Sequence, residues 1–271
     1  MKLCVLASGS RGNAILIQAG KTRVVVDAGL SPRTLCARLR TVGVDPMSIE
    51  GVVVTHEHTD HVRGAAGAAE KWGWRLIATR GTTEASVSLA GKPVETVRSG
   101  SAFLVGDLEF TVIATSHDAT EPVAVFATSR CTGERAALVY DLGVMTSELQ
   151  RGLELSDIVV IESNHDGEML RNGPYPASVR RRIASRHGHL SNAAAGRAAA
   201  ECAHRGLRNV VLAHLSEVNN TPGLAAGAMR DALARTVFRG AITTASQDRP
   251  TRVFCVSSAK NGGAEQLVLG I

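Results

Sequence analysis

The chain contains, at residues 56–61, the sequence His56-Glu57-His58-Thr59-Asp60-His61. A β-branched run at 51–54 precedes it and predicts a buried strand, and a stretch rich in Ala and Gly follows it, as at a helix start. His56 and His58 alternate in direction as they leave the strand and can reach one ion. Asp60 and His61 lie about half a turn further on. Since one ion needs only three or four ligands, the spacing suggests two adjacent metals.

Three later strands are each followed closely by a His or an Asp. The predicted strands at 109–114, 136–140 and 209–213 lead into His117, Asp141 and His214. Alone, each of these residues could be a hydrogen-bonded loop His or a turn-forming Asp. Two lesser alternatives for residues 56–61 are a polar surface loop and a single structural metal site. Together the segments supply a ligand set of the size that two ions need when one carboxylate bridges them. That set is His56, His58, Asp60, His61, His117, Asp141 and His214.

The pattern His-x-His-x-Asp-His resembles the signature motif of the metallo-β-lactamase superfamily. The resemblance implies that His56, His58 and His117 hold the first metal. It implies that Asp60, His61 and His214 hold the second, with Asp141 bridging them. The segment 24–29 resembles the early strand-Asp-x-Gly element of that superfamily, in which the Asp, here Asp27, supports the ligand loop.

Four further segments narrow the resemblance. They are Ala7–Asn13, Ser116–Ala119, Glu162–Asp166 and Gly188–Asn192. This combination is similar to the YycJ or WalJ subgroup, which is placed near DNA-processing exonucleases. The implied fold is an αββα four-layer sandwich.

Periodicity and composition agree with an α/β domain. Strands are predicted near 2–7, 14–18, 22–26, 51–54, 109–114, 123–128, 136–140, 158–161, 209–213 and 252–256. Helices are predicted near 31–42, 61–72, 177–186, 192–205 and 222–235. This mixed order predicts two sheets packed face to face with helices outside. The 271 residues, 44% of them hydrophobic, fit a single domain spanning 1–271. The stretch between Asp141 and His214 is too short for the extra domain of β-CASP nucleases.

Cysteine usage and hydropathy indicate the cellular compartment in which the protein is expected. The five cysteines are scattered, with no C-x-x-C spacing, which favours a reducing cytoplasm. No apolar run reaches the roughly 18–20 residues of a membrane span. The first strand is too short for the apolar core of a signal peptide.

The formal net charge is +5, and part of the excess is concentrated in one segment. The cluster contains Arg171, Arg180, Arg181, Arg182 and Arg186. Arginines suit phosphates, and we expect Arg181 and Arg182 to contact substrate. A solvated helix face explains the cluster equally well. Aromatic residues are only 3% of the chain, so nucleic acid would be bound through phosphates and a chain end rather than by stacking.

A leaving alkoxide needs a proton donor. His189 is the first candidate, because it precedes a predicted helix start where backbone N–H groups favour anions. His165, which follows the predicted strand at 158–161, is the second; either could instead be a structural loop residue. Asn164 and Asn192 are predicted to hydrogen-bond substrate. Asp60 is predicted to be a catalytic residue as well as a metal ligand.

The first functional hypothesis is a binuclear metal-dependent phosphodiesterase. It would be a 5′–3′ exonuclease-like enzyme acting on DNA or RNA ends, with a hydroxide shared by two Zn²⁺ or Mn²⁺ ions. The alternative is a small-molecule hydrolase of thioesters or lactones, as in glyoxalase II and lactonase relatives. A third reading is a metal-holding scaffold without turnover. A true β-lactamase is disfavoured, because no Cys stands at the proposed site. The sequence leaves the oligomeric state open.

Overall fold

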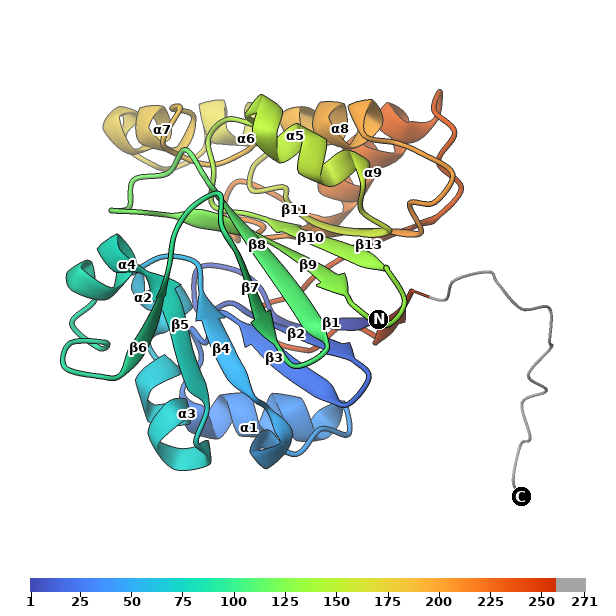
Figure 1. Ribbon diagram of the computed structural model, residues 1–271. Helices are drawn as coiled ribbons and strands as arrows, with labels where there is room; N and C mark the ends of the chain where they lie inside the picture. Colours follow the sequence, from blue (N-terminus) through green and yellow to red (C-terminus); the bar gives the residue numbers. More distant parts are fainter. Residues whose placement is uncertain (257–271) are drawn as a thin grey trace, which may run out of the picture.

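Two seven-stranded sheets pack face to face in the computed structural model, which describes residues 1–256 (Figure 1). The first sheet has the order β14-β1-β2-β3-β4-β5-β6. Its strands are β1 (Lys2–Ala7), β2 (Ala14–Ala19), β3 (Thr22–Val26), β4 (Gly51–Val54), β5 (Arg75–Thr79), β6 (Val94–Val97) and β14 (Phe254–Cys255). Residues 257–271, included above in the predicted domain, lie outside the described residues.

The second sheet has the order β13-β12-β11-β10-β9-β8-β7. Its strands are β7 (Ala102–Val105), β8 (Leu108–Ala114), β9 (Val123–Ser129), β10 (Arg135–Val139), β11 (Ile158–Glu162), β12 (Asn209–Ala213) and β13 (Ala241–Thr244). Strands β3 to β6 are parallel to one another, and so are β10 to β13. Within each parallel set the carboxyl ends therefore meet at one edge, where ligands bind in sheets of this kind.

Helices cover the outer face of each sheet (Figure 1). Outside the first sheet lie α1 (Pro32–Thr41) and α3 (Ala65–Trp72), and outside the second lie α5 (Ser147–Glu154), α8 (Asn192–Glu201) and α9 (Pro222–Leu233). Short helices occupy the connections: η1 (Pro46–Ser48), α2 (Thr59–Val62), α4 (Arg80–Ala85), α6 (Gly167–Asn172) and α7 (Ala177–Ile183). This is the predicted αββα sandwich of the metallo-β-lactamase fold.

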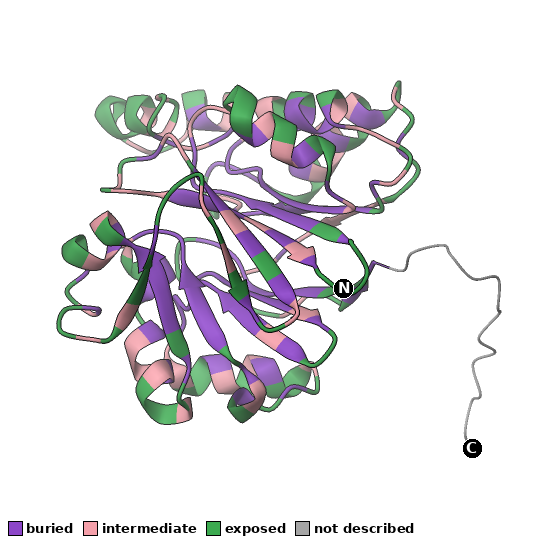
Figure 2. Cartoon of the chain, in the orientation of Figure 1, coloured by how far each residue is buried: buried purple, intermediate pink, exposed green. Residues whose placement is uncertain are grey.

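Three apolar layers hold these elements together, as the buried interior in Figure 2 indicates. Between the sheets, Phe110, Leu138 and Val160 belong to one buried cluster. Leu35 and Leu39, one helical turn apart, bury one face of α1 against the first sheet. Ser31 caps this helix by accepting a hydrogen bond from the Thr34 N–H, and Pro32 follows in the first turn.

Several predicted boundaries differ from the structure. The helix predicted over 61–72 is two helices separated at Gly64, whose N–H donates to the Ala28 carbonyl oxygen. A Cβ at Gly64 would lie 1.9 Å from the Leu30 carbonyl oxygen, so this close approach requires glycine. Helices α7 and α8 also end before the predicted residues 186 and 205. The sequence does not predict strands β5, β6, β7 and β13.

Among residues 1–256 no helix is long and apolar enough to cross a membrane.

We predict that Phe110→Ala lowers the free energy of unfolding by about 3–5 kcal/mol, because it leaves a cavity between the two sheets. Phe110 is fully buried there, whereas Leu104 on the neighbouring edge strand is 50% exposed. Urea denaturation followed by circular dichroism measures the change. Leu104→Ala is the control and should stay within about 1 kcal/mol of the wild type; equal losses in the two variants would contradict the assignment of the core.

Candidate metal centre

The seven predicted metal ligands meet at the carboxyl edge of the sheets. His56 and His58 follow β4, and Asp60 and His61 lie in α2. The other three come from after β8, β10 and β12; they are His117, Asp141 and His214. A short polar turn after a buried strand therefore brings each side chain to the same place, although the residues lie far apart in the sequence.

Four groups among the described residues have the spacing of metal ligands, one of them Asp141, Glu162, His189 and His214, and two of the four match the ligand sets that the resemblance implies. One ligand-type atom each of His56, His58 and His117 lies within 4.8 Å of the others, and the same holds for Asp60, His61 and His214. In the first group, His117 Nε2 is 3.3 Å from His58 Nδ1. In the second, Asp60 Oδ2 is 3.4 Å from His61 Nε2 and 3.5 Å from His214 Nε2.

Asp141 lies between the two groups. It forms a third set of ligand-type atoms with His56 and His61, and its Oδ2 is 3.0 Å from His61 Nε2. Its Oδ1 is 3.2 Å from His214 Nδ1. This is the position that a bridging carboxylate would need.

Two imidazole nitrogens test whether the cluster fits metal ions. His56 Nε2 and His214 Nε2 are buried and have no hydrogen-bond partner among the described residues. A buried polar atom without a partner costs about 1–3 kcal/mol. A divalent cation would give both nitrogens a partner, and imidazole and carboxylate are ligands that such cations accept. The cluster is consistent with a binuclear metal site.

The electrostatics of the cluster depend on its carboxylates. Burial lowers the pKa of His56 well below its ordinary value, and the neighbouring imidazole of His61 lowers it further. For His214, burial alone also lowers the pKa, but Asp141, Asp60 and Glu162 outweigh burial and raise it to about 10. The same balance, with Asp27 and Asp141, raises the pKa of His61 well above its ordinary value. Protons and metal ions would therefore compete for these imidazoles.

Three residues at strand ends have left-handed backbone conformations. Asp27, Asp141 and His214 have φ values of 58°, 55° and 53°, and they are the non-glycine residues with positive φ among residues 1–256. This conformation costs an L-residue roughly 1–2 kcal/mol. The strain is stored at the cluster, as is common at functional sites.

Asp27 holds the first ligand loop, as the resemblance implies. Its carboxylate accepts hydrogen bonds from the Thr55 N–H at 2.8 Å and from the Tyr140 hydroxyl at 2.7 Å. Asp27 Oδ2 also lies 2.7 Å from His61 Nδ1, so His61 Nε2 faces the cluster. A carboxylate on the far nitrogen of an imidazole fixes the ring and makes it a better ligand.

Glu162, the last residue of β11, has no predicted role in the sequence. It is fully buried, and its Oε2 accepts hydrogen bonds from the N–H groups of Leu142 and Leu190. Its Oε1 lies 2.8 Å from His189 Nδ1 and 3.1 Å from His214 Nδ1. The sequence contained a signal for Glu162, because it ends an apolar strand and the same pattern identified Asp141.

His189 lies at the edge of the cluster, whereas His165 does not contact it. The His189 ring is 5.2 Å from the rings of His117 and His214, and its side chain is 22% exposed. Burial alone lowers the pKa of His189, but Glu162 and Asp141 outweigh burial and raise it. His165 is buried, has no hydrogen bond from Nδ1 within residues 1–256, and has its pKa lowered by burial.

Comparison with known proteins assigns the family. Residues 7–128 match the model of the metallo-β-lactamase superfamily. The chain is 36% identical over 225 residues to the exodeoxyribonuclease YycJ of Bacillus anthracis, covering 82% of this chain and 84% of that protein. It is 32% identical over 240 residues to the exodeoxyribonuclease WalJ of Streptococcus pneumoniae serotype 2, covering 86% and 88% of the two chains.

The chain belongs to the metallo-β-lactamase superfamily.

Two solved structures have the same fold. YhfI from Bacillus subtilis superposes with a TM-score of 0.69 at 17% identity, covering 92% of this chain and 98% of that one. Zn²⁺-bound PqqB from Methylobacterium extorquens superposes with a TM-score of 0.67 at 18% identity, covering 93% and 99%. At these identities the likeness concerns the fold alone.

The predicted substrate contacts have different environments in this metallo-β-lactamase fold. Asn164 and Asn192 are buried, and their amides donate to the His214 carbonyl oxygen and to Asn220 Oδ1 at 2.9 Å each. These bonds favour a positioning role, so substrate contact by either residue stays a prediction. Arg182 donates from Nε to Asp118 at 2.7 Å beside the His117 loop, and Arg181 lies on the exposed surface of α7.

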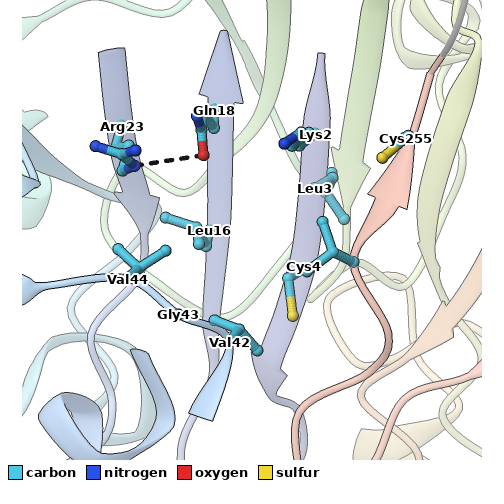
Figure 3. Close-up of a pocket in the computed structure, with 11 residues that line it drawn as sticks. Lys2, Leu3, Cys4, Leu16, Gln18, Arg23, Val42, Gly43, Val44 and Cys255 are labelled. Atoms are coloured by element: carbon cyan, nitrogen blue, oxygen red, sulfur yellow. Dashed lines mark hydrogen bonds between the residues drawn. The ribbon is translucent and has the colours of Figure 1, made fainter. Parts of the chain in front are cut away.

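A separate hollow of about 360 Å³ lies on the outer face of the first sheet (Figure 3). It is lined by residues of β1, β2, β3 and β14 and by the chain after α1, with Lys2, Gln18 and Arg23 in one row across the strands. None of the predicted site residues lines it. The hollow is therefore distinct from the candidate metal centre.

We predict that Asp27→Asn weakens metal binding by about 10–100-fold, because an amide cannot accept all the bonds that orient His61 and the Thr55 turn. Competition with a chromogenic chelator measures the affinity. Asp45→Asn makes the same change at the start of η1, where asparagine caps equally well, and serves as the control. Unchanged affinity in Asp27→Asn would contradict the supporting role.

Proposed function

We propose that this protein is a metal-dependent exodeoxyribonuclease. The observation that carries the proposal is the pair formed by His189 and the buried Glu162 at the edge of the cluster, 2.8 Å apart. Cleavage of a phosphodiester releases an alkoxide, which needs a proton donor beside the reacting phosphorus. The names of the relatives that span most of this chain support DNA as the substrate.

In this proposal His56, His58 and His117 would hold one ion, Asp60, His61 and His214 would hold the other, and Asp141 would contribute to both. Bound divalent cations, Zn²⁺ or Mn²⁺ by this donor set, would lower the pKa of a water and polarise a phosphoryl oxygen. Asp27 keeps the His61 ring oriented through its Nδ1. In this arrangement the metal ligands do not have to transfer the proton that the leaving oxygen needs.

His189 serves as the general acid. Glu162 accepts the Nδ1 proton of His189, so the other ring nitrogen, Nε2, carries the proton that passes to the leaving oxygen. Burial lowers the pKa of His189, but Glu162 and Asp141 outweigh burial and raise it, which favours the protonated ring that a general acid needs. His165 has no such partner among residues 1–256 and is the second choice.

The nuclease activity is tested with oligonucleotides labelled at either end, single- and double-stranded, and with protein loaded separately with Mn²⁺ and Zn²⁺. We expect stepwise shortening from one end, and the label that is lost first gives the direction. Asp60→Ala, which removes one carboxylate from the second group of ligands, should abolish it. If the wild type binds about two ions per chain and cleaves no oligonucleotide with either metal, the proposal fails and a thioester or lactone hydrolase becomes the better hypothesis.

We predict that His189→Ala lowers kcat for DNA by about 10²–10⁴-fold and leaves the metal content unchanged. The loss should be much smaller for a p-nitrophenyl phosphodiester, whose leaving group departs without a proton. His165→Ala is the matched comparison and should reduce kcat less. Equal losses on both substrates, or a larger loss in His165→Ala, would contradict the assignment of His189.

A further inference from the structure

A basic arm formed by α6, α7 and the segment between them lies in the helical layer outside the second sheet (Figure 1). The sequence has no Asp or Glu between Glu168 and Glu201. None of the residues of α7 is buried, and Figure 2 shows this helix as exposed and intermediate surface. A short helix without a buried face is not explained by packing, which is the usual source of helix stability in proteins.

The arm carries a hollow of about 450 Å³. Its lining consists of Leu170, Arg171, Ala177, Arg180, Arg181 and Ala184. Within residues 1–256 no carboxylate pairs with any of the three arginines, and the Arg180 guanidinium donates to the Arg171 carbonyl oxygen. Three like charges therefore surround an apolar surface without a counter-charge from the protein.

Arg182, the next residue along α7, has a different environment. Its guanidinium donates from Nε to Asp118 Oδ2 at 2.7 Å, one residue from His117. The Ile183 carbonyl oxygen accepts the His189 N–H at 2.9 Å, and the Arg186 carbonyl oxygen accepts the Ser116 hydroxyl at 2.7 Å. The end of the arm is thus fixed to the loops that carry His117 and His189.

The hollow lies next to this attachment. Arg181 and Ala184, which line the hollow, flank Arg182 and Ile183 in the chain. A strand whose end lies at the candidate centre would therefore run past the hollow.

We propose that this hollow binds one nucleotide of a single-stranded segment of the DNA substrate, an inference that rests on the proposed function. The guanidinium groups of Arg171, Arg180 and Arg181 contact backbone phosphates, and the apolar surface receives the face of an unpaired base. Arginine offers paired donors to phosphate and can also stack on a base. In a duplex, stacking on the neighbouring base pairs covers that face, so the hollow favours single strands.

The test compares two double variants that lose the same charge. Arg180→Gln with Arg181→Gln changes the hollow, whereas Arg33→Gln with Arg40→Gln changes exposed residues of α1, on the outer face of the first sheet. Both pairs are made in the His189→Ala background so that DNA is not degraded during binding. Thermal unfolding checks that each variant folds.

The affinity for a single-stranded oligonucleotide is measured over a range of salt concentrations. Two lost phosphate contacts should reduce the slope of log Kd against log salt by about 1.4 in the hollow variant, with no change in the α1 variant. Binding of a blunt duplex should change less. An equal change in both variants, or an equal change for duplex and single strand, would overturn the proposal.

Steady-state kinetics in the wild-type background give a second readout. The hollow variant should raise KM several-fold for a long oligonucleotide and leave KM unchanged for thymidine p-nitrophenyl phosphate, which is too short to reach the hollow. If the wild type degrades DNA and the hollow variant has the same salt slope and the same KM, the proposal that the hollow binds a nucleotide is wrong and the proposed function stands. If the wild type neither binds nor degrades DNA, both fail.

Discussion

The structure depends on one constraint: imidazoles and carboxylates must be buried together at the carboxyl edge of the two sheets. None of these groups is stable there alone, because burial penalises each charge and each polar atom without a partner. They become compatible because carboxylates lie against several of the imidazoles, as the raised pKa of His214 beside Asp141, Asp60 and Glu162 shows. Two nitrogens of the cluster have no hydrogen-bond partner within residues 1–256, His56 Nε2 and His214 Nε2, and cations would complete the balance there.

Two buried carboxylates connect the cluster to the rest of the fold. Asp27 follows β3 of the first sheet and accepts a hydrogen bond from Tyr140, which follows β10 of the second, so one side chain joins both sheets at the cluster. Glu162 ends β11 and binds the N–H groups of Leu142 and Leu190, which fixes the chain beside Asp141 and beside His189. The rigid apolar layers on both sides let these residues keep their strained or desolvated positions.

The candidate centre and the basic arm have separate parts in the proposed function. The candidate centre is built from strand ends, whose positions are fixed by the sheets, whereas the basic arm lies on the surface with no buried residue in α7. The contact between Arg182 and Asp118 joins the two parts. A cluster of arginines in the sequence thus divides into one that holds the His117 loop and others that remain available to phosphates.

The sequence by itself determined the superfamily and the αββα fold, and it predicted the metal-ligand types, because ligand spacing and β-branched runs are local patterns. Only the tertiary structure revealed the role of Glu162, because a carboxylate at a strand end acquires partners only when distant loops are brought to it. The break at Gly64 is also a tertiary effect, since it depends on the approach of the Leu30 carbonyl oxygen. Likewise, His189 and His165 look alike in the sequence, and packing decides that only the first contacts Glu162.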